Sequence, residues 1–345
     1  MIETIVLHYT DRCNIECAHC CVSSGPKRTT KFEPAAARDL IQQAAALGIG
    51  AVKFTGGESL LFPEEILELT RLAGSLGLEV GVVTNGFWAP TVEAGKAFLE
   101  PFVASGLREL DVSVDVWHWK FLDPGQVGHA IAAARSFPEL LVRMYRVLKA
   151  DESPTDPAFY AAYGLDLEAL RFESCNANDM LRRRLDGAAN GVTVRWTYAS
   201  RIGRAKSLPL ADTRTVPVAE VAPARCTEVT MAPIAYPDGT LYACCSGKVP
   251  RPLVAGNLRE TSLAELQGRM ERNALLQFIA TFSPKELHDA LVARGVELPK
   301  NCDSVCHICK SALSKVDDAL LQEVATEEWN RNVLSQLLGS EILHG

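Results

Sequence analysis

The sequence lacks every stretch that would carry a chain into or across a membrane. No run of 18 apolar residues occurs among its 345 residues, so we expect no membrane-spanning helix. The first residues, MIETIVLHYT, hold no basic segment and place Glu3 within their apolar part, which argues against a signal peptide. The sequence also lacks an excess of positive charge: its formal net charge of −7 argues against broad nucleic-acid binding. These absences predict a cytoplasmic protein that binds neither membrane nor nucleic acid.

Cysteine, in contrast, is abundant and clustered. A chain in a reducing compartment rarely forms structural disulfides, so its eleven cysteines favour metal or redox roles. Four lie within residues 13–21, three within 226–245 and three within 302–309, and Cys175 stands alone. Cysteines that act only as small hydrophobic residues scatter along a chain. The grouping therefore favours metal ligands.

The first two thirds of the chain alternate between strand and helix patterns. The expected strands are residues 3–9, 51–55, 79–84, 109–115, 140–148 and 192–199. The expected helices are 33–50, 63–77, 91–106 and 124–137, and a polar, proline-rich stretch with one or two helices precedes the last strand. Six β/α units imply a parallel sheet with right-handed crossovers, and they fall short of the eight that close a full barrel. We predict an α/β fold, an open (β/α)6 partial TIM barrel with its mouth at the strand carboxyl ends.

The rest of the chain predicts a second, smaller region. Residues 205–225 contain several prolines and little periodicity, as linkers do. YPDGTLYACC then carries an Asp-Gly pair that suits a hairpin turn, and residues 262–296 are expected to be helical. The predicted domains are the barrel at 1–204, the linker at 205–225, a small α+β cysteine-bearing domain at 226–312 and an amphipathic C-terminal helix at 313–345.

Cys13, Cys17 and Cys20 follow the first strand with the spacing C-x3-C-x2-C. On a helix this spacing would line one face, so packing of three buried thiols is one alternative, and a zinc site is another. The intervening residues are mostly polar, which argues against packing. Zinc usually takes four protein ligands in paired C-x2-C units. Three thiolates on one short loop fit a [4Fe–4S] cluster with one iron left open for a substrate or cofactor.

This motif and four other segments resemble the radical S-adenosylmethionine (SAM) superfamily. FTGGES is similar to the family's GGE element, and VTNG, VSVD and SRIGRA follow the third, fourth and sixth expected strands. All lie at strand carboxyl ends, where open α/β folds bind ligands. The resemblance implies that SAM binds the open iron and is cleaved to methionine and a 5′-deoxyadenosyl radical, which abstracts hydrogen from the substrate. It also implies an external electron donor such as flavodoxin or ferredoxin.

Seven residues at these strand ends are implied to bind SAM: His19, Gly56, Gly57, Glu58, Asn85, Ser113 and Asp115. The glycines would let backbone carbonyls approach the SAM amino group, because no Cβ stands in the way, and the glutamate would orient their loop. The histidine would lie beside the adenine, and the serine and aspartate would point toward the ribose, with the asparagine nearby. The alternative for the two glycines is a plain tight turn. The alternative for Asn85, Ser113 and Asp115 is that they are ordinary polar residues at strand ends.

The segment DVWHWKFLDPGQ follows the fourth strand at the barrel mouth. Trp117 and Trp119 could stack on substrate or pack against the next helix. His118 is the candidate catalytic residue, since a histidine there could move a proton. Cys21 lies outside the three-cysteine motif, and we expect it to pack.

The later cysteines form a second pattern. Cys226 and Cys244 give C-x12-G-x4-C, and Cys306 and Cys309 give C-x2-C. The pattern resembles the SPASM and twitch extensions that hold auxiliary iron–sulfur clusters in radical SAM enzymes. Because the long cysteine run of a full SPASM domain is missing, the resemblance implies a twitch-like domain in which these four cysteines bind a second [4Fe–4S] cluster. A four-cysteine zinc site is the alternative.

Two cysteines of this region are left over. Cys245 adjoins Cys244, and adjacent side chains of a strand face opposite ways, so only one should reach a cluster. Cys302 could replace one of the later pair or contact substrate. A fully ligated auxiliary cluster would act as an electron acceptor and would complete a two-electron oxidation.

The expected activity is that of an oxidoreductase that dehydrogenates or cross-links a ribosomally made peptide. No leader-binding module precedes the first strand, so a separate leader-peptide-binding protein is the expected partner. The alternative substrate is a small hydroxylated or sugar-like metabolite. A non-catalytic iron–sulfur or zinc protein is the alternative from another class, and the intact GGE and three-cysteine motifs argue against it.

Overall fold

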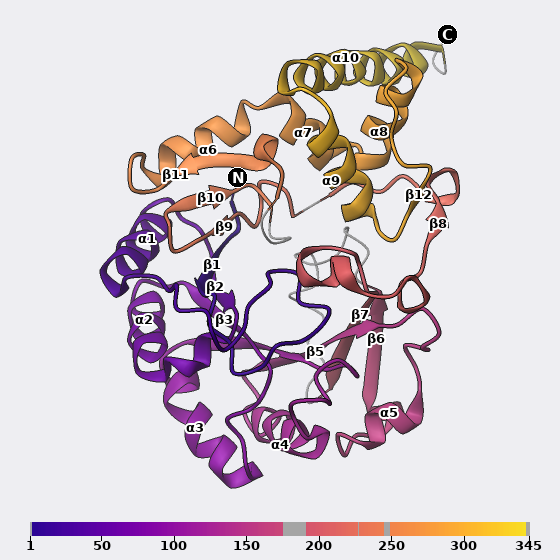
Figure 1. Cartoon of the computed structure of the whole chain (residues 1–345). Coiled ribbons are helices and arrows are strands. Elements are labelled where there is room, and N and C mark those ends of the chain that lie inside the picture. Colours follow the sequence, from indigo (N-terminus) through magenta and orange to yellow (C-terminus); the bar gives the residue numbers. More distant parts are fainter. Residues whose placement is uncertain (1, 175–190, 227, 245–248, 343–345) are drawn as a thin grey trace.

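The computed structural model describes residues 2–174, 191–226, 228–244 and 249–342 (Figure 1). Its first part alternates strands with helices, as the sequence predicts. The strands are β1 (Thr4–Thr10), β2 (Ala51–Gly56), β3 (Glu79–Thr84), β4 (Leu107–Ser113) and β5 (Leu141–Leu148). The helices are α1 (Pro34–Ala46), α2 (Pro63–Ser75), α3 (Val92–Ala104), α4 (Pro124–Ala134) and the short α5 (Pro157–Ala161).

These strands and two more form the parallel part of one sheet, in the order β1-β2-β3-β4-β5-β7-β6. The expected α/β fold with a parallel sheet is therefore confirmed. The sixth expected strand is β7 (Val192–Tyr198), which lies beside β5. The strand β6 (Leu170–Ser174) pairs with β7 at the edge, within the stretch where the sequence predicted only helices and polar loop. Only Leu170 of these five residues is buried, so they show no alternation of buried and exposed positions, and their pairing with β7 supports the extended conformation.

The two faces of this sheet differ in polarity. Phe54, Val112 and Met144 belong to the fully buried apolar face, which packs against helices such as α1 to α4 on the outer side (Figure 1). The opposite face carries charges: Arg143 Nε donates to Asp111 Oδ1 at 2.7 Å, and Lys53 pairs with the same carboxylate. A cavity of about 240 Å³ lies against this charged face. The alternation of the strands thus separates an apolar core from a polar interior.

The region after β7 extends the same sheet. Three short strands add to its β1 edge in the order β11-β10-β9-β1: β9 (Ile234–Ala235), β10 (Thr240–Tyr242) and β11 (Val254–Asn257). The β9–β10 pair is antiparallel, and Gly239 between them has φ +87°, so the predicted Asp-Gly hairpin turn is present. The expected linker contains short 3-10 helices and β8 (Val216–Pro217), which pairs with β12 (Asn301–Cys302).

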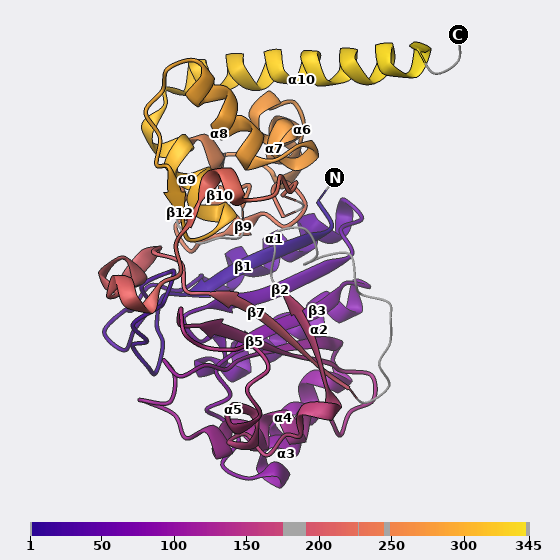
Figure 2. The same cartoon turned by 90° about the vertical axis from the view of Figure 1, so that its right-hand side faces the viewer.

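Helices complete the C-terminal part: α6 (Leu263–Glu271), α7 (Ala274–Thr281), α8 (Pro284–Ala293), α9 (Val305–Lys315) and α10 (Asp318–Ile342). The N-terminal half of α10 buries Leu321 and Val324 against α7 and α8. Farther along, Leu334 is 56% exposed, and Figure 2 shows the helix projecting beyond the rest of the molecule. Within the described residues, no helix combines the length and apolar character needed to cross a membrane.

Candidate active site

The first three cysteines lie on the loop that follows β1, residues 13–21, here named the cysteine loop. Cys13 and Cys17 are buried and Cys20 is half-buried, and all three contact the same small apolar cluster. Burial raises the pKa of Cys13 to about 12, and the charges of Glu58, Cys17 and Cys20 act in the same direction. Three thiols on one short loop suit a bound cationic centre, which would stabilise their thiolates. The donor set therefore fits a metal cluster.

The GGE turn holds the start of the cysteine loop. Gly57 N–H donates to Thr10 O at 2.6 Å, and Glu58 N–H donates to Arg12 O at 2.9 Å. A Cβ on Gly56 would lie 2.4 Å from Thr10 O, and one on Gly57 would lie 2.1 Å from Arg12 O. No side chain fits so close to a backbone oxygen. The glycines are thus required by contact with the end of β1 and with Arg12, which lead into the cysteine loop, a reason that the motif alone does not reveal.

Glu58 links this turn to the turn after β3. Its buried carboxylate accepts hydrogen bonds from Asn85 N–H at 2.8 Å, Thr84 Oγ1 at 3.0 Å and Leu60 N–H at 3.2 Å. Burial raises its pKa to about 7, although these hydrogen bonds oppose the rise. Asn85 in turn donates from Nδ2 to Asn14 Oδ1 on the cysteine loop at 2.8 Å. Glu58 therefore joins the GGE turn to the turn after β3.

The SRIGRA segment holds the other end of the cysteine loop. Arg204 donates from Nη1 to Cys17 O at 2.6 Å and from its backbone N–H to Cys20 O at 3.0 Å. Gly203 has φ +59°, and a Cβ there would lie 2.2 Å from Cys21 O. The cysteine loop is consequently fixed from two sides by segments distant in the sequence. The anchoring by Arg204 was missed, although the motif that contains it was noted.

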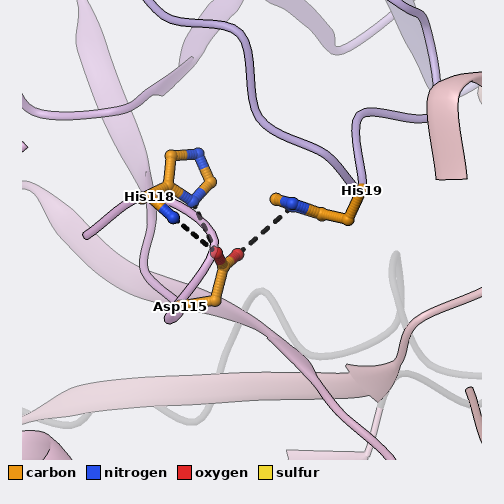
Figure 3. Close-up of side chains that lie close together, drawn as sticks. All are labelled: His19, Asp115 and His118. Carbon is orange, nitrogen blue, oxygen red and sulfur yellow. Dashed lines mark hydrogen bonds and ion pairs between the residues drawn. The ribbon is translucent and has the colours of Figure 1, made fainter. Parts of the chain in front are cut away.

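Beyond the cysteine loop, Asp115 brings two histidines together (Figure 3). This carboxylate is 1% exposed, and its Oδ1 accepts from His118 Nδ1 at 2.8 Å and from the backbone N–H groups of Trp117 and His118. Its Oδ2 lies 3.3 Å from His19 Nε2. The expectation that Asp115 belongs to the fourth strand is wrong: β4 ends at Ser113, because Asp115 instead accepts hydrogen bonds from the following turn.

The two histidines differ in charge because they share one carboxylate. Burial lowers the pKa of His19 to about 4, and the neighbouring His118 adds to this effect against the attraction of Asp115. For His118 burial also opposes charging, but Asp115 and a side-chain hydrogen bond with Cys17 hold its pKa well above the ordinary value. The histidines keep the pKa of Asp115 below its ordinary value despite burial. Near neutral pH the group is therefore an ion pair of Asp115 and His118 beside a neutral His19.

The tryptophans of the next segment have structural neighbours. Trp119 stacks on Phe159 with ring centroids 5.2 Å apart, and its Nε1 donates to Tyr163 Oη at 2.8 Å. Trp117 stacks on His19 at 5.7 Å. Trp119 thus packs against neighbouring aromatic side chains. Trp117 lies against His19, which the sequence analysis expects to bind SAM.

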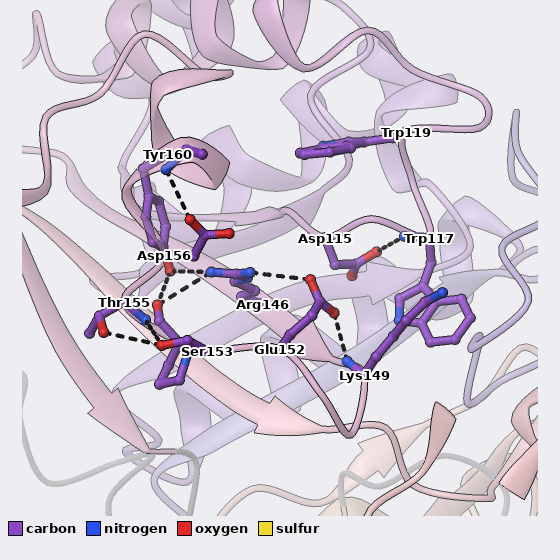
Figure 4. Close-up of polar contacts among 12 residues, drawn as sticks. Asp115, Trp117, Trp119, Arg146, Lys149, Glu152, Ser153, Thr155, Asp156 and Tyr160 are labelled. Carbon is purple, nitrogen blue, oxygen red and sulfur yellow. Dashed lines mark hydrogen bonds and ion pairs between the residues drawn. The ribbon is translucent and has the colours of Figure 1, made fainter. Parts of the chain in front are cut away.

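An arginine of β5 and the lysine that follows this strand belong to a further polar group (Figure 4). Arg146, 1% exposed, donates from Nη1 to Tyr160 Oη at 3.2 Å and pairs with Glu152 at 3.2 Å. Lys149 Nζ lies 5.0 Å from the ring centroid of Trp117. These residues were missed by the sequence analysis, because basic residues within a strand pattern carry no signal of what they face.

The structure also brings the four predicted auxiliary cysteines together. Burial raises the pKa of Cys309 well above its ordinary value, and Cys244, Cys226 and Cys306 each raise it further. Cys306 and Cys309 lie one turn apart on α9, whereas the other two flank the β9–β10 hairpin. Segments separated by 62 (306 − 244) to 83 (309 − 226) positions thus deliver four thiols to one place, a donor set that suits a metal centre.

The remaining cysteines belong to neither of these two groups of thiols. Cys302 is 1% exposed and packs with Val218 and Ile308. The expectation that Cys21 packs is wrong, because it is exposed and lies near Cys306 and Lys310. Positions 175 and 245, the last two cysteines, lie outside the described residues.

Curated proteins of other organisms are similar to part of this chain. YydG of Bacillus subtilis (strain 168), named for peptide biosynthesis, is 25% identical over 151 residues, which cover 44% of this chain and 47% of YydG. GTP 3',8-cyclase of Chlorobaculum tepidum is 30% identical over 116 residues, 33% of each protein. The chain therefore spans less than half the length of these curated relatives.

Among solved structures, native anSMEcpe with bound AdoMet and Cp18Cys peptide is similar in fold, with a TM-score of 0.50 and 15% identity. The match covers 94% of this chain and 99% of that one. Residues 7–146, which contain the cysteine loop, the GGE turn and Asp115, match the model of the Radical SAM superfamily. This part of the chain is therefore similar to the proteins of the radical SAM superfamily.

Proposed function

We propose that the protein is a radical SAM enzyme that oxidises a ribosomally made peptide, by dehydrogenation or cross-linking. The observation that carries the proposal is the cysteine loop itself: three converging thiols, held by the GGE turn and by Arg204, within a radical SAM domain. In this proposal Cys13, Cys17 and Cys20 bind a [4Fe–4S] cluster. When bound, this cluster and SAM supply radical hydrogen abstraction from the substrate.

The residues around the loop would bind SAM and keep water out. The SAM-binding set is the one predicted from the sequence: His19, Gly56, Gly57, Glu58, Asn85, Ser113 and Asp115. His19 supports this assignment, because its Nδ1 is buried and has no hydrogen-bond partner among the described residues. A buried ring nitrogen of this kind suits a ligand that brings its own donor or acceptor, as an adenine does. The stacking of Trp117 on the same ring closes one side of this place.

We further propose that Cys226, Cys244, Cys306 and Cys309 bind a second [4Fe–4S] cluster in a twitch-like domain. The convergence of four half-buried thiols supports this assignment, and their number leaves no open ligand position for substrate. Such a centre would take the electron that remains on the substrate after hydrogen abstraction. A zinc ion at the same four thiols is the competing assignment, and metal analysis separates the two.

The peptide substrate is supported by two of the similar proteins, one named for peptide biosynthesis and one with a peptide bound. An external electron donor such as flavodoxin or ferredoxin and a separate leader-peptide-binding protein are part of the proposal. A small metabolite is the second candidate, because the similar GTP 3',8-cyclase is named for a small-molecule substrate.

The test uses the full chain, reconstituted anaerobically with iron and sulfide. It is incubated with SAM, dithionite and synthetic peptides whose sequences are encoded beside its gene, and the products are analysed by mass spectrometry. We expect deoxyadenosine and a peptide that has lost about two hydrogens, formed in proportion. The variant with Ala at Cys13, Cys17 and Cys20 should form neither product. If no peptide reacts and a hydroxylated metabolite yields a ketone, the second candidate is correct.

A further inference from the structure

Tyr236 is buried where the C-terminal part of the chain joins the edge of the barrel sheet. It follows β9 directly, is 3% exposed, and stacks its ring on His8 of β1 with ring centroids 4.4 Å apart. Tyr242, the last residue of β10, meets the same ring edge-on at 5.3 Å. On the other side, His8 Nε2 lies 2.8 Å from Asp11 Oδ1, just before the cysteine loop. Tyr236 therefore lies between the start of the cysteine loop and the strand that leads to Cys244.

The hydroxyl group of Tyr236 is the unusual feature of this packing. Its Oη is buried and has no hydrogen-bond partner among the described residues. Buried tyrosine hydroxyls usually have a partner, because an unpaired one loses its hydrogen bonds to water without replacement. A phenylalanine would fill the same space without this cost. The hydroxyl group thus needs a reason other than packing.

A buried water molecule is the competing explanation, since it could bond to the hydroxyl. A water of this kind needs several polar partners to be held in place. Tyr236 instead packs in a small cluster with the apolar side chains of Val6, Ala232 and Ile234, here named the Tyr236 cluster. A bound ligand that brings its own hydrogen-bond acceptor meets the need better than a water does.

The Tyr236 cluster adjoins the cavity of about 240 Å³ on the charged face of the sheet, because Val6 and Ala232 belong to the cluster and also line the cavity. Tyr145 of β5 lines it as well, and this residue pairs in the sheet with Ser113, a member of the proposed SAM-binding set. The cavity therefore extends from the Tyr236 cluster toward the proposed SAM site. A substrate that enters it would lie next to both.

We propose that Tyr236 binds the substrate, and that its hydroxyl group donates a hydrogen bond to a carbonyl oxygen of the peptide. The inference rests on the proposed oxidation of a peptide and names a residue that holds it. A phenol is a hydrogen-bond donor, and a peptide carries a carbonyl acceptor at every residue. The bond supplies the partner that the buried hydroxyl lacks, and it holds the peptide between the two cysteine groups. Tyr236 is thus a substrate-binding residue.

The first measurement separates a hydroxyl that binds a ligand from one that stabilises the fold. Tyr236→Phe removes only the hydroxyl, and thermal unfolding is followed anaerobically for the full reconstituted chain without peptide. We expect an unfolding temperature equal to that of the wild type or higher, because the variant buries no unpaired hydroxyl. Tyr160→Phe is the matched control: Tyr160 Oη donates to the Pro154 carbonyl at 2.6 Å, so its loss should lower the unfolding temperature by about 2–4 °C. A Tyr236→Phe protein that is destabilised as much as the control would overturn the inference, because its hydroxyl would then have a partner within the fold.

The second measurement is peptide binding. The probe is the peptide that the wild type oxidises in the test described above, labelled with a fluorophore and added to reconstituted protein with SAM and without dithionite, so that no reaction occurs. Because one hydrogen bond to the peptide is lost, we expect the Kd from fluorescence anisotropy and the KM of the reaction to rise about tenfold in Tyr236→Phe. Iron content and the deoxyadenosine formed without peptide should stay unchanged. A Tyr236→Phe protein with the wild-type Kd and KM overturns this inference alone, whereas a wild type that oxidises no peptide overturns the proposed function and the inference with it.

Discussion

Arg204 and Cys17 are 187 positions apart in the chain, and a hydrogen bond of 2.6 Å joins the guanidinium Nη1 of the first to the carbonyl oxygen of the second. The same arginine also binds the Cys20 carbonyl through its backbone. The conformation of the cysteine loop therefore depends on a residue that follows β7, outside the matched residues 7–146. A short loop with little secondary structure is thus held in place by a residue from a distant part of the chain.

Replacing Arg204 should weaken the first cluster site. A hydrogen bond from a charged group contributes about 1.5–3 kcal/mol, and less where the group is partly exposed, so Arg204→Ala should loosen the loop without unfolding the barrel. We expect bound iron to fall from about eight toward about four per chain, as measured by iron analysis after reconstitution. Arg201→Ala is the control, since Arg201 donates to the Lys206 carbonyl instead. Full iron content in the Arg204 variant would show that the loop does not need this anchor.

Gly57→Ala should be strongly destabilising. The added methyl group would lie 2.1 Å from Arg12 O, a backbone atom that cannot move without shifting the cysteine loop. Such overpacking costs about 1–3 kcal/mol, and the fall should appear as a lower unfolding temperature of the iron-free protein. Gly268→Ala serves for comparison, because Gly268 lies within α6 and its nearest neighbour is the flexible end of Arg272. That change should be neutral or stabilising. Equal stability of the two variants would contradict the close approach seen here.

Glu58 should make stability depend on pH. Burial raises its pKa from the ordinary value of 4.5 to about 7 in the folded protein, so the folded state holds a proton that the unfolded state releases. Its contribution is fully present below about pH 4.5 and is lost as pH rises to about 7, at no more than about 1.4 kcal/mol per pH unit. Denaturant unfolding of iron-free protein at several pH values measures this slope.

Glu58→Gln should flatten the decline in stability between pH 4.5 and pH 7. Glu64→Gln, at an exposed position in the first turn of α2, is the control and should keep the wild-type slope. An identical slope in all three proteins would mean that Glu58 is ionised throughout this range.

Removal of the second cysteine group should separate SAM cleavage from product formation. In the Cys306→Ala, Cys309→Ala double variant we expect about half the iron and continued deoxyadenosine formation with dithionite, while oxidised product falls at least about tenfold, because the electron acceptor is lost. Cys302→Ala should keep all the iron, since Cys302 packs apart from the four thiols. A double variant that is folded and still forms product at the wild-type rate would exclude the acceptor role.

The regular part of the fold could be predicted because its pattern is local. The strand and helix periods identified β1 to β5 and β7 within a few residues, since each buries one face against the same core. The strand β6 could not be predicted, as its five residues become extended through pairing with β7. The end of β4 was misplaced by two residues because Asp115 bonds to the turn that follows.

The candidate site was predictable as a set of motifs and not as a set of contacts. The three-cysteine and GGE motifs signalled which residues matter, because their spacing is short and specific. The sequence does not indicate that Asp115 contacts both His19 and His118. His19 and Asp115 are 96 positions apart in the chain (115 − 19), and only the order of the strands in the sheet brings them together. Arg146 likewise carried no signal, because the loop that supplies its partners has no periodic pattern.

Because β9 pairs with β1, the C-terminal part of the chain covers the edge of the strand that leads into the cysteine loop. Val6 and Leu7 face Ile234 and Ala235 in parallel register, and Glu3 and Thr4 both donate to the Met231 carbonyl. A barrel cut after residue 225 would leave this apolar strand as an open edge, ready to pair with another copy. The ribosome must therefore release more than 230 residues before β9 can cover the edge of β1.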